Sequence, residues 1–305
     1  MSYLLLVSLI WAFSFGIIKT NLADLDSNFI AALRLGLALL VFLPFFKPGL
    51  VDRRITLKLG LIGAVQYGGM YVAYLYSFRY LQAYEVALFT IFTPLYVTLL
   101  DDCLVRRVRW VSLAAVLLTI AGAWIVKSGS ALPPGLLAGF LVVQLSNLCF
   151  AFGQVYYRHV MARRLPSGRA MNDRQIFAIP YLGGFLLAGL AAGFSILFHV
   201  VQGSPVNLTP TASQWLALLY LGVISSGLCF FLWNVGARKV NAGALAIFND
   251  LKIPLAVAVS LLFFGESADL LRLFLGGGLG ALALLLNEWG LKRSSSQLVS
   301  EPKLG

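Results

Sequence analysis

The sequence predicts an all-α membrane protein with ten transmembrane helices arranged as two inverted five-helix repeats. Of the 305 residues, 60% are hydrophobic and 11% are charged, and the mean hydropathy is +0.87. A soluble core of this length could not bury so much apolar surface. Ten apolar stretches are each long enough to cross a bilayer, which takes about 20 helical residues. Pro94 and Pro254 lie at the same depth in the fourth and ninth stretches, so the chain divides into two similar sets of five.

The expected spans lie near residues 3–20, 28–47, 57–79, 82–104, 109–127, 135–157, 175–200, 214–237, 242–264 and 271–291. We expect the first repeat in residues 1–130, the second in residues 131–293, and a disordered cytoplasmic tail in residues 294–305. Because five is odd, the second repeat must enter the membrane from the opposite side. A short match supports the duplication: residues 13–16 are Phe-Ser-Phe-Gly and residues 150–153 are Phe-Ala-Phe-Gly. The alternative is a chance match between two apolar helices.

Basic residues indicate the orientation of the chain. Lys and Arg cluster in alternate connections, for example Arg106, Arg107 and Arg109 after the fourth span. The opposite connections carry Lys19, Arg79, Lys127 and Arg272. Excess Lys and Arg mark the cytoplasmic side, so both termini are expected in the cytoplasm. The net charge of +11 is therefore a topology signal, and we expect the lipid bilayer but no nucleic acid as a partner.

Several kinds of chemistry have no support in the sequence. The cysteines Cys103, Cys149 and Cys229 are isolated, and the two histidines, His159 and His199, lie near predicted span ends. Neither a metal site nor a disulfide framework is expected. No Gly-x-x-x-x-Gly-Lys-Ser/Thr loop is present, so direct use of ATP is not expected, and no cofactor is implied. An intramembrane enzyme remains the weaker alternative, since it needs a nucleophile with its base or metal ligands at depth.

Several motifs carry a family resemblance. Residues 11–19, Trp-Ala-Phe-Ser-Phe-Gly-Ile-Ile-Lys, resemble the first-helix signature of the EamA family of the drug/metabolite transporter superfamily, a Trp-Gly-x-x-Phe run ending in Lys. Arg34, between two leucines, and the downstream Pro44 are similar to that family's Arg-Phe motif and its proline. In the second half, the family's order is followed by Trp215, Gly222, Trp233, Ala242, Ala246, Pro254, Gly265 and Glu266.

The resemblance covers nearly the whole chain and implies a transporter with a family-type membrane fold, here expected in the bacterial cytoplasmic membrane. The family and its relatives include exporters of amino acids and other metabolites and transporters of sugars, nucleotide sugars and sugar phosphates. Two departures weaken any transfer of substrate. Arg106 stands where the first repeat often has an acidic residue, and Asn249, Asp250 and Lys252 occupy a segment that is usually apolar.

The ninth span carries two ionisable residues at depth. Asp250 and Lys252 lie about 12 Å and about 15 Å from the expected start of the span, near the bilayer midplane. An ionised group there costs about 2.5 to 3.5 kcal/mol, so such residues usually face a polar cavity or a partner. We expect Lys252 to bind a substrate carboxylate or phosphate, and Asp250 to bind an amine or carry a proton. The alternative is structural neutralisation, although two positions apart on a helix they point in different directions.

The paired prolines are expected to break helices and to serve in gating. Pro254 cannot donate to the carbonyl of Asp250, which leaves an acceptor free beside the charged residues. Paired breaks in inverted repeats commonly mark a transport site at mid-membrane. Pro94 is expected to act in the same way in the first repeat.

The second span contains Arg34, which keeps its charge and therefore needs a carboxylate, carbonyls or water nearby. Glu85 is one candidate partner, and the alternative is that Glu85 caps its own helix. Lys19 is expected to extend toward the interface. A structural role is favoured for Arg34 and Glu85, with substrate binding by Arg34 as the functional alternative.

Uncharged polar residues at similar depth complete the candidate substrate-binding set. Gln144 and Asn147 share a helix face at spacing i, i+3, and Asn249 precedes Asp250. On the third span Tyr67, Tyr71 and Tyr74 form a stripe beside Gln66. Such a stripe is commonly core, but the amide beside it favours a cavity wall. Ser225 and Ser226 are interpreted as helix-packing residues and the tryptophans mostly as an interfacial belt.

These observations favour a secondary carrier that exports small polar metabolites such as amino acids by alternating access between the repeats. The alternative is an exchanger of phosphorylated or carboxylated metabolites, suggested by the basic residues Lys252, Arg34 and Lys19. Proton or counter-substrate coupling is expected to supply the energy, with Asp250 and Glu85 as candidate proton carriers. We expect a monomer or a weak dimer.

Overall fold

The computed structural model describes residues 2–104, 134–162, 171–240 and 242–300, with a few positions between 114 and 125. Over these residues the chain forms helices and turns without strands, which confirms the all-α class. Within the described part of the chain, six helical segments are long and apolar enough to cross a membrane. They are Ser2–Asn21, Ser27–Phe45, Ala83–Leu104, Leu136–Met161, Asp173–Val201 and Ala212–Ala237. The fifth predicted span, 109–127, falls largely outside the described residues.

The described N-terminal part of the bundle contains four helical runs, two of which are interrupted by a short segment of another helix type. These elements are α1 (Ser2–Asn21), α2 (Ser27–Phe42) with the 3₁₀ turn η1 (Leu43–Phe45), α3 (Arg53–Gly63), the π-helical segment η2 (Ala64–Gly69), α4 (Met70–Ser77), α5 (Ala83–Phe89), the 3₁₀ turn η3 (Thr90–Phe92) and α6 (Thr93–Leu104). The predicted third span is therefore one rod made of α3, η2 and α4.

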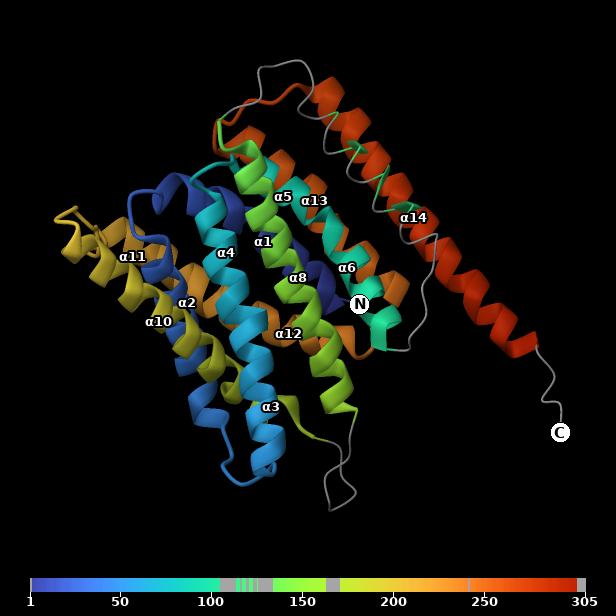
Figure 1. Ribbon diagram of the computed structural model, residues 1–305, viewed down its shortest axis with the longest axis horizontal. Coiled ribbons are helices and arrows are strands. Elements are labelled where there is room, and N and C mark those ends of the chain that lie inside the picture. The colour runs from blue at the N-terminus through green and yellow to red at the C-terminus, as the bar shows by residue number, and fades with distance from the viewer. Residues whose placement is uncertain are drawn as a thin grey trace.

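The C-terminal part also consists mainly of long helices. Its elements are α8 (Leu136–Met161), α9 (Asp173–Ile176), α10 (Ala178–Val201), α11 (Ala212–Leu219), the π-helical segment η4 (Tyr220–Leu228), α12 (Cys229–Ala237), α13 (Ala242–Phe263) and α14 (Leu270–Ser300). Helix α14 lies along one side of the bundle and extends beyond it (Figure 1). It continues through Ser300, past residue 294, where the disordered tail was expected to begin.

The two prolines differ in their effect on the helices. Before Pro94 the helix is interrupted by η3, and Pro94 is the second residue of α6. Helix α13 runs through Pro254 without a break, so the helix break expected there is wrong. A proline removes one helical hydrogen bond, but membrane helices tolerate it where neighbouring groups compensate the freed carbonyl.

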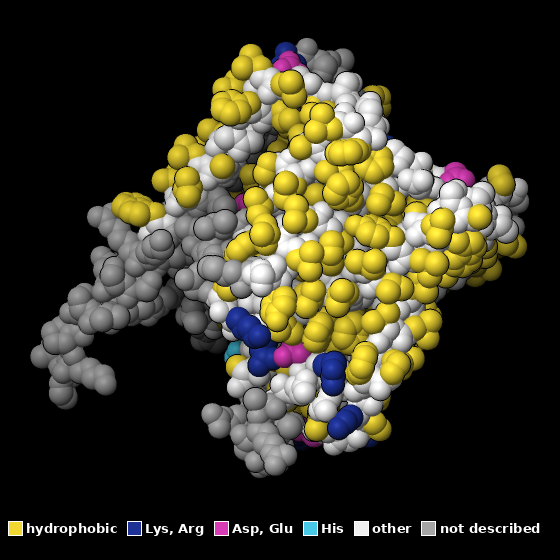
Figure 2. Space-filling view, turned by 180° about the vertical axis from the view of Figure 1, so that it is seen from behind, with side chains coloured by type: hydrophobic (Ala, Val, Ile, Leu, Met, Phe, Trp, Pro, Cys, Tyr) yellow, Lys and Arg dark blue, Asp and Glu magenta, His cyan; other side chains and the backbone are white. Residues whose placement is uncertain are grey.

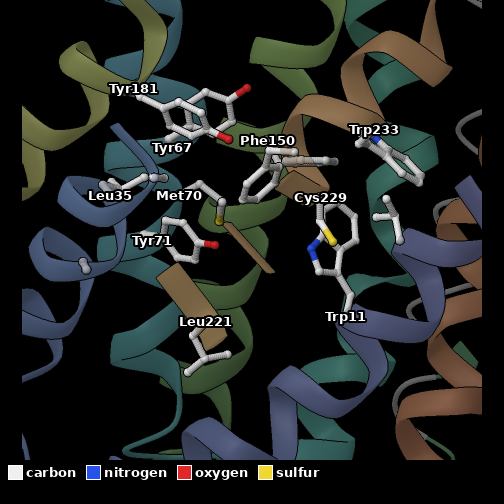
Figure 3. Close-up of a cluster of buried hydrophobic side chains, with 14 of the residues drawn as sticks. Trp11, Leu35, Tyr67, Met70, Tyr71, Phe150, Tyr181, Leu221, Cys229 and Trp233 are labelled. Atoms are coloured by element: carbon white, nitrogen blue, oxygen red, sulfur yellow. The ribbon is translucent and has the colours of Figure 1, made fainter. Parts of the chain in front are cut away.

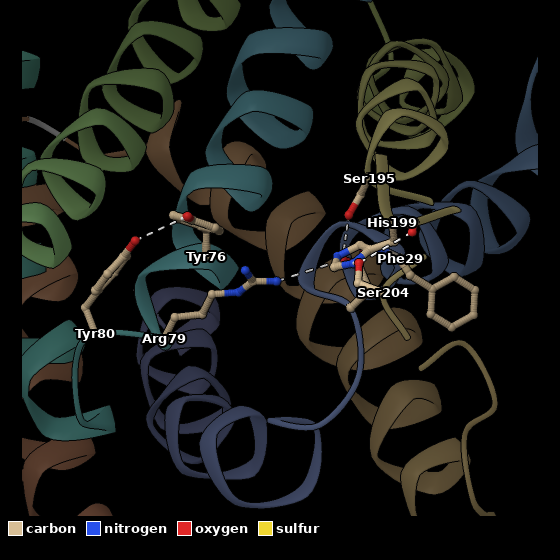
Figure 4. A network of polar contacts seen from close by, with 8 residues as sticks. Phe29, Tyr76, Arg79, Tyr80, Ser195, His199 and Ser204 are labelled. Carbon is tan, nitrogen blue, oxygen red and sulfur yellow. Dashed lines mark hydrogen bonds and ion pairs between the residues drawn. The ribbon is translucent and has the colours of Figure 1, made fainter. Parts of the chain in front are cut away.

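Asp26, which caps the start of α2, also contacts residues that are distant in the sequence. Asp26 caps α2 by accepting a hydrogen bond from the backbone N–H of Phe29 at 2.8 Å. The other carboxylate oxygen of Asp26 accepts from the Ser195 hydroxyl at 2.8 Å and lies 4.0 Å from Arg79 (Figure 4). The cap thus ties the start of α2 to α10 and to the end of α4.

The molecular surface has the distribution of polarity that a bilayer requires. Leu, Phe, Ile and Val side chains are exposed along most of the long helices. Figure 2 shows apolar side chains covering the middle of one face, with Lys and Arg side chains gathered toward one end. An exposed apolar belt bordered by charge is the surface of a protein whose solvent is lipid.

Glycines bring α3 and α10 into backbone contact. A Cβ atom built at Gly183 would overlap the carbonyl oxygen of Gly60, and one built at Gly63 would overlap the carbonyl of Pro180. Small residues at a helix crossing permit this close approach, which favours association inside a membrane. The contact joins the third predicted span to the seventh.

We expect Gly183→Ala to destabilise the protein by about 1–3 kcal/mol, because the added methyl group must push α3 away from α10. Gly189 is a matched control on the same helix, since no atom lies within 4 Å of its built Cβ. Gly189→Ala should be neutral or slightly stabilising, because alanine is the better helix former. Thermal unfolding of the two purified variants in the same detergent tests this, and equal melting temperatures would contradict the packing argument.

Candidate functional site

A cavity lies between the helices in the interior of the bundle. Together with the space at its mouth it holds about 550 Å³. Residues from both the N-terminal and the C-terminal parts of the chain form its wall. They are Trp11, Ser14, Phe15, Arg34, Met70, Tyr71, Tyr74, Thr90, Thr93, Ser146, Asn147, Phe150, Ser225, Phe230 and Lys252. Of the ten predicted substrate-binding residues, five line this cavity: Arg34, Tyr71, Tyr74, Asn147 and Lys252.

Lys252 enters the cavity from α13 and is held by neighbouring polar groups. Its Nζ donates to Oδ1 of Asn249 at 3.1 Å, and Nδ2 of Asn249 donates to Oδ1 of Asp250 at 3.0 Å. Asn249 therefore bridges the two ionisable residues, which do not contact each other directly. The second oxygen of Asp250, Oδ2, is buried without a hydrogen-bond partner in the part of the chain that the structure describes.

The Lys252 ammonium also lies against aromatic rings. Its Nζ is 5.5 Å from the centre of the Trp11 ring and 6.0 Å from that of Phe150. Rings present their negative faces to cations, so both contacts favour the charged ammonium. Lys252 is only 6% exposed, and these rings with Asn249 replace part of its hydration.

Arg34 lies on another wall of the cavity, in a polar cluster built by α2, α4 and η4. Its Nη2 donates to the Tyr71 hydroxyl at 2.8 Å, and its Nε donates to the Ser226 hydroxyl at 3.2 Å. The Tyr71 and Ser226 hydroxyls lie 2.7 Å apart, and the guanidinium carbon is 4.3 Å from the centre of the Tyr71 ring. Glu85, considered above as a partner, instead accepts from the backbone N–H of Gln82 at 2.8 Å and caps α5.

The π-helical segment η4 shapes the Arg34 cluster. The Tyr181 hydroxyl donates to the carbonyl oxygens of Ser226 and Gly227, each at 2.7 Å. A π-helical segment alters the regular ladder of backbone hydrogen bonds and is frequent at functional sites. Here it places Ser226 beside Arg34, a role beyond the packing function that we predicted for this serine.

Aromatic side chains form much of the apolar wall. Trp11 contacts Phe230 and Trp233, with ring centres 5.1 Å and 5.2 Å apart. Its indole N–H donates to the carbonyl oxygen of Ser225 at 2.9 Å. Phe150 lies within the same cluster, next to Trp11. Figure 3 shows Tyr67 and Tyr181 stacked on each other, on the side of Phe150 away from Trp11. The cavity thus combines two cations with a wide aromatic surface.

The predicted amide pair on α8 closes part of the wall. Nδ2 of Asn147 donates to the carbonyl oxygen of Phe89 at 2.8 Å and to Oε1 of Gln144 at 3.1 Å. Phe89 precedes η3, where the helix is interrupted, so its carbonyl is available to a side chain. Asn147 reaches the cavity, whereas Gln144 lies behind it and holds Asn147 in place.

Gln66 and Tyr67 lie outside the cavity lining. Tyr67 accepts a hydrogen bond from Nδ2 of Asn234 at 2.7 Å and stacks on Tyr181. Both amide atoms of Gln66 are buried and have no partner among the described residues. Gln66 is part of η2 and packs on Gly153, where a Cβ would overlap it. Spacing on one helix could not distinguish these two residues from Tyr71 and Tyr74, because η2 changes the residues per turn.

Several lining residues were missed in the sequence. Trp11 was grouped with an interfacial belt, but it lies in the cavity and is 8% exposed. Trp11 lies in the middle of a predicted span, away from both interfaces, and this position could have indicated that it is not part of an interfacial belt. Thr90, Thr93, Met70 and Phe230 carried no distinguishing pattern, since such residues are common throughout membrane helices.

At one end of the bundle, charged side chains hold the connection between α4 and α5. Glu266 accepts from the backbone N–H groups of Ala83 and Tyr84 at 2.8 Å and 3.0 Å. Nζ of Lys19 donates to the carbonyl oxygens of Phe78 and Leu81 at 2.7 Å and 2.9 Å. Lys19 is thus a structural clamp and not simply a side chain extended to the interface.

The model of the EamA-like transporter family matches residues 1–128 and again residues 137–289. The chain belongs to the EamA-like transporter family. It is an integral, multi-pass membrane transporter that acts on a small-molecule substrate.

Curated relatives of this transporter share most of its length. A protein of Pseudomonas aeruginosa named "Probable biotin transporter" is 40% identical over 95% of this chain and 98% of that protein. The "Biotin transporter" of Escherichia coli is 37% identical over 97% of this chain and 95% of that protein. The "Biotin transporter" of Salmonella typhimurium is 40% identical over 86% of this chain and 84% of that protein.

A solved structure supports the fold of the transporter. One crystal structure aligns with a TM-score of 0.62 over 95% of this chain and 96% of the other, at 17% identity, which bears on the fold alone. The relatives' names give no support to amino acids as the substrate, contrary to our first expectation. Proteins that share a fold can serve different substrates, so the fold of the solved structure does not identify the substrate of this chain.

Proposed function

We propose that this transporter carries biotin across the bacterial cytoplasmic membrane as a secondary carrier. The main support is the identity of 37–40% to proteins named biotin transporters over most of the chain. Biotin is a carboxylated metabolite, so the proposal follows the second of our sequence-based alternatives with respect to substrate chemistry. It replaces the expectation of amino acid export, and the relatives' names specify no direction of transport.

The chemistry of the cavity supports a ligand of this type. Biotin has a bicycle in which an apolar thioether ring is fused to a ureido ring that both donates and accepts hydrogen bonds, and it carries one carboxylate on a flexible chain. The aromatic surface of Trp11, Phe150 and Phe230 offers contact for the thioether ring and the aliphatic chain. Asn147 and the nearby hydroxyls suit the ureido group, and a basic side chain of the wall suits the carboxylate. Ligand sites of this kind are mostly apolar with a few oriented polar groups.

Alternating access between two inverted repeats is the proposed mechanism. We assign residues 1–130 and 131–293 to the repeats, with ten spans and both termini in the cytoplasm. Support comes from the two separate family matches. It also comes from the π-helical segments Ala64–Gly69 and Tyr220–Leu228, which interrupt the third rod of each proposed repeat. The cavity has walls from both repeats, so their relative movement would change access to it.

Uptake into proteoliposomes tests the proposed substrate. Purified protein should mediate saturable accumulation of radiolabelled biotin, above the level in protein-free liposomes. Unlabelled biotin should compete, whereas amino acids and phosphate esters should not. Saturable flux of an amino acid without biotin flux would restore the first alternative and overturn the proposal.

A further inference from the structure

We infer that Arg34 binds the carboxylate of the substrate, an assignment that rests on the proposed biotin transport. The guanidinium of Arg34 is a fixed cation in the cavity wall, and one of its nitrogens has no hydrogen-bond partner among the described residues. Lys252, in contrast, is linked through Asn249 to the carboxylate of Asp250. The two basic residues of the cavity would therefore have different tasks.

The first observation is an unused donor. Arg34 is 2% exposed, lines the cavity, and its Nη1 is buried without a hydrogen-bond partner among the described residues. A buried donor without a partner is costly, so such a group usually marks a place where a ligand or water completes the bonding. A carboxylate oxygen is the strongest acceptor that this donor could meet.

The second observation is that the guanidinium is held rigidly. Its Nε and Nη2 are engaged by Ser226 and Tyr71, and the Tyr71 ring lies against its carbon. These contacts leave Nη1 as the free corner of a planar group with a fixed direction. A donor fixed in advance loses little conformational entropy when a ligand binds, which favours selectivity for an anion at one position.

The third observation is the balance of charge. No Asp or Glu forms an ion pair with Arg34 in the described part of the chain. Lys252 is connected through Asn249 to the carboxylate of Asp250. With Lys252 and Asp250 offsetting one another, the cavity retains the single positive charge of Arg34. One carboxylate neutralises it, which matches a monocarboxylate such as biotin.

The assignment predicts selectivity for charged over neutral ligands. Binding of biotin and of its neutral amide, biotinamide, is measured by titration calorimetry on the purified full chain. The wild-type protein should bind biotin about tenfold or more tightly than biotinamide, as expected for a hydrogen bond to a charged group. Arg34→Gln should bring the ratio of the two dissociation constants close to one. Asp250→Asn combined with Lys252→Met removes both linked charges and so keeps the net charge of the cavity; it should weaken both ligands by a similar factor and preserve the ratio.

Each outcome decides between the hypotheses. Absence of biotin binding to the wild-type protein rejects the proposed substrate itself. Binding with a ratio that survives Arg34→Gln, or that collapses in the Asp250→Asn/Lys252→Met double variant, overturns the assignment of Arg34. Where Arg34→Gln does not fold, Arg34→Lys is used: the ammonium keeps the charge but lacks the planar donor set, so the ratio should fall without reaching one. An unchanged ratio in that variant also overturns the assignment.

Discussion

Substitution of Lys252 by methionine is expected to reduce biotin transport by at least about tenfold and to lower the thermal stability of the protein. The ammonium is bonded to Asn249, lies against the rings of Trp11 and Phe150, and lines the cavity. Its loss leaves the Asp250 carboxylate buried without its counter-charge, which costs about 3–5 kcal/mol when one partner of a buried pair is removed. Flux in proteoliposomes and thermal unfolding in detergent measure the two effects.

A double variant separates transport from structure at this position. Asp250→Asn combined with Lys252→Met removes both charges, so much of the lost stability should return. Transport should stay low, because the cavity still lacks its ammonium. Full recovery of biotin flux in the double variant would mean that the two residues only neutralise each other, which is the structural alternative.

Truncation of Trp11 to alanine is expected to cost about 3–5 kcal/mol in stability and to weaken biotin binding strongly. The indole contacts Phe230, Trp233 and Lys252, and its N–H is bonded to the Ser225 carbonyl. Alanine would remove the apolar wall and leave that carbonyl without its donor. Thermal unfolding and titration with biotin measure the two effects.

Two controls sharpen the test of Trp11. Trp11→Phe keeps a ring in the cavity and should retain most of the stability, losing about 1 kcal/mol for the hydrogen bond. Trp215 is a tryptophan on the outer surface, 41% exposed, and Trp215→Ala should change binding little. Equal losses at positions 11 and 215 would contradict a specific role for the cavity wall.

Much of the fold could be predicted from hydropathy, because lipid requires long apolar runs whose backbone bonds are satisfied within each helix. The rods beginning at Ser2, Ser27, Ala83, Leu136 and Ala212 start within a few residues of the predicted spans. Lys252 and Arg34 could be predicted as cavity residues from the sequence. A charge at membrane depth is costly, so a charged residue there usually faces a polar environment.

The remaining features depend on contacts that one helix cannot reveal. The uninterrupted path of α13 at Pro254 and the π-helical segments η2 and η4 arise from packing between helices. Without knowledge of η2, the side of the third rod that carries Gln66 and Tyr67 could not be assigned. Trp11 was misplaced because aromatic residues at interfaces are common and those in cavities have the same hydropathy.

The glycine contact between α3 and α10 has a mechanical consequence. At Gly60, Gly63 and Gly183 two backbones touch with no side chain between them, so no rotamer change can absorb a displacement there. Around the cavity, by contrast, long side chains such as Lys252 and Met70 can adjust to new positions. During any rocking of the two halves, the glycine crossing would serve as the fulcrum and the cavity walls would travel farthest.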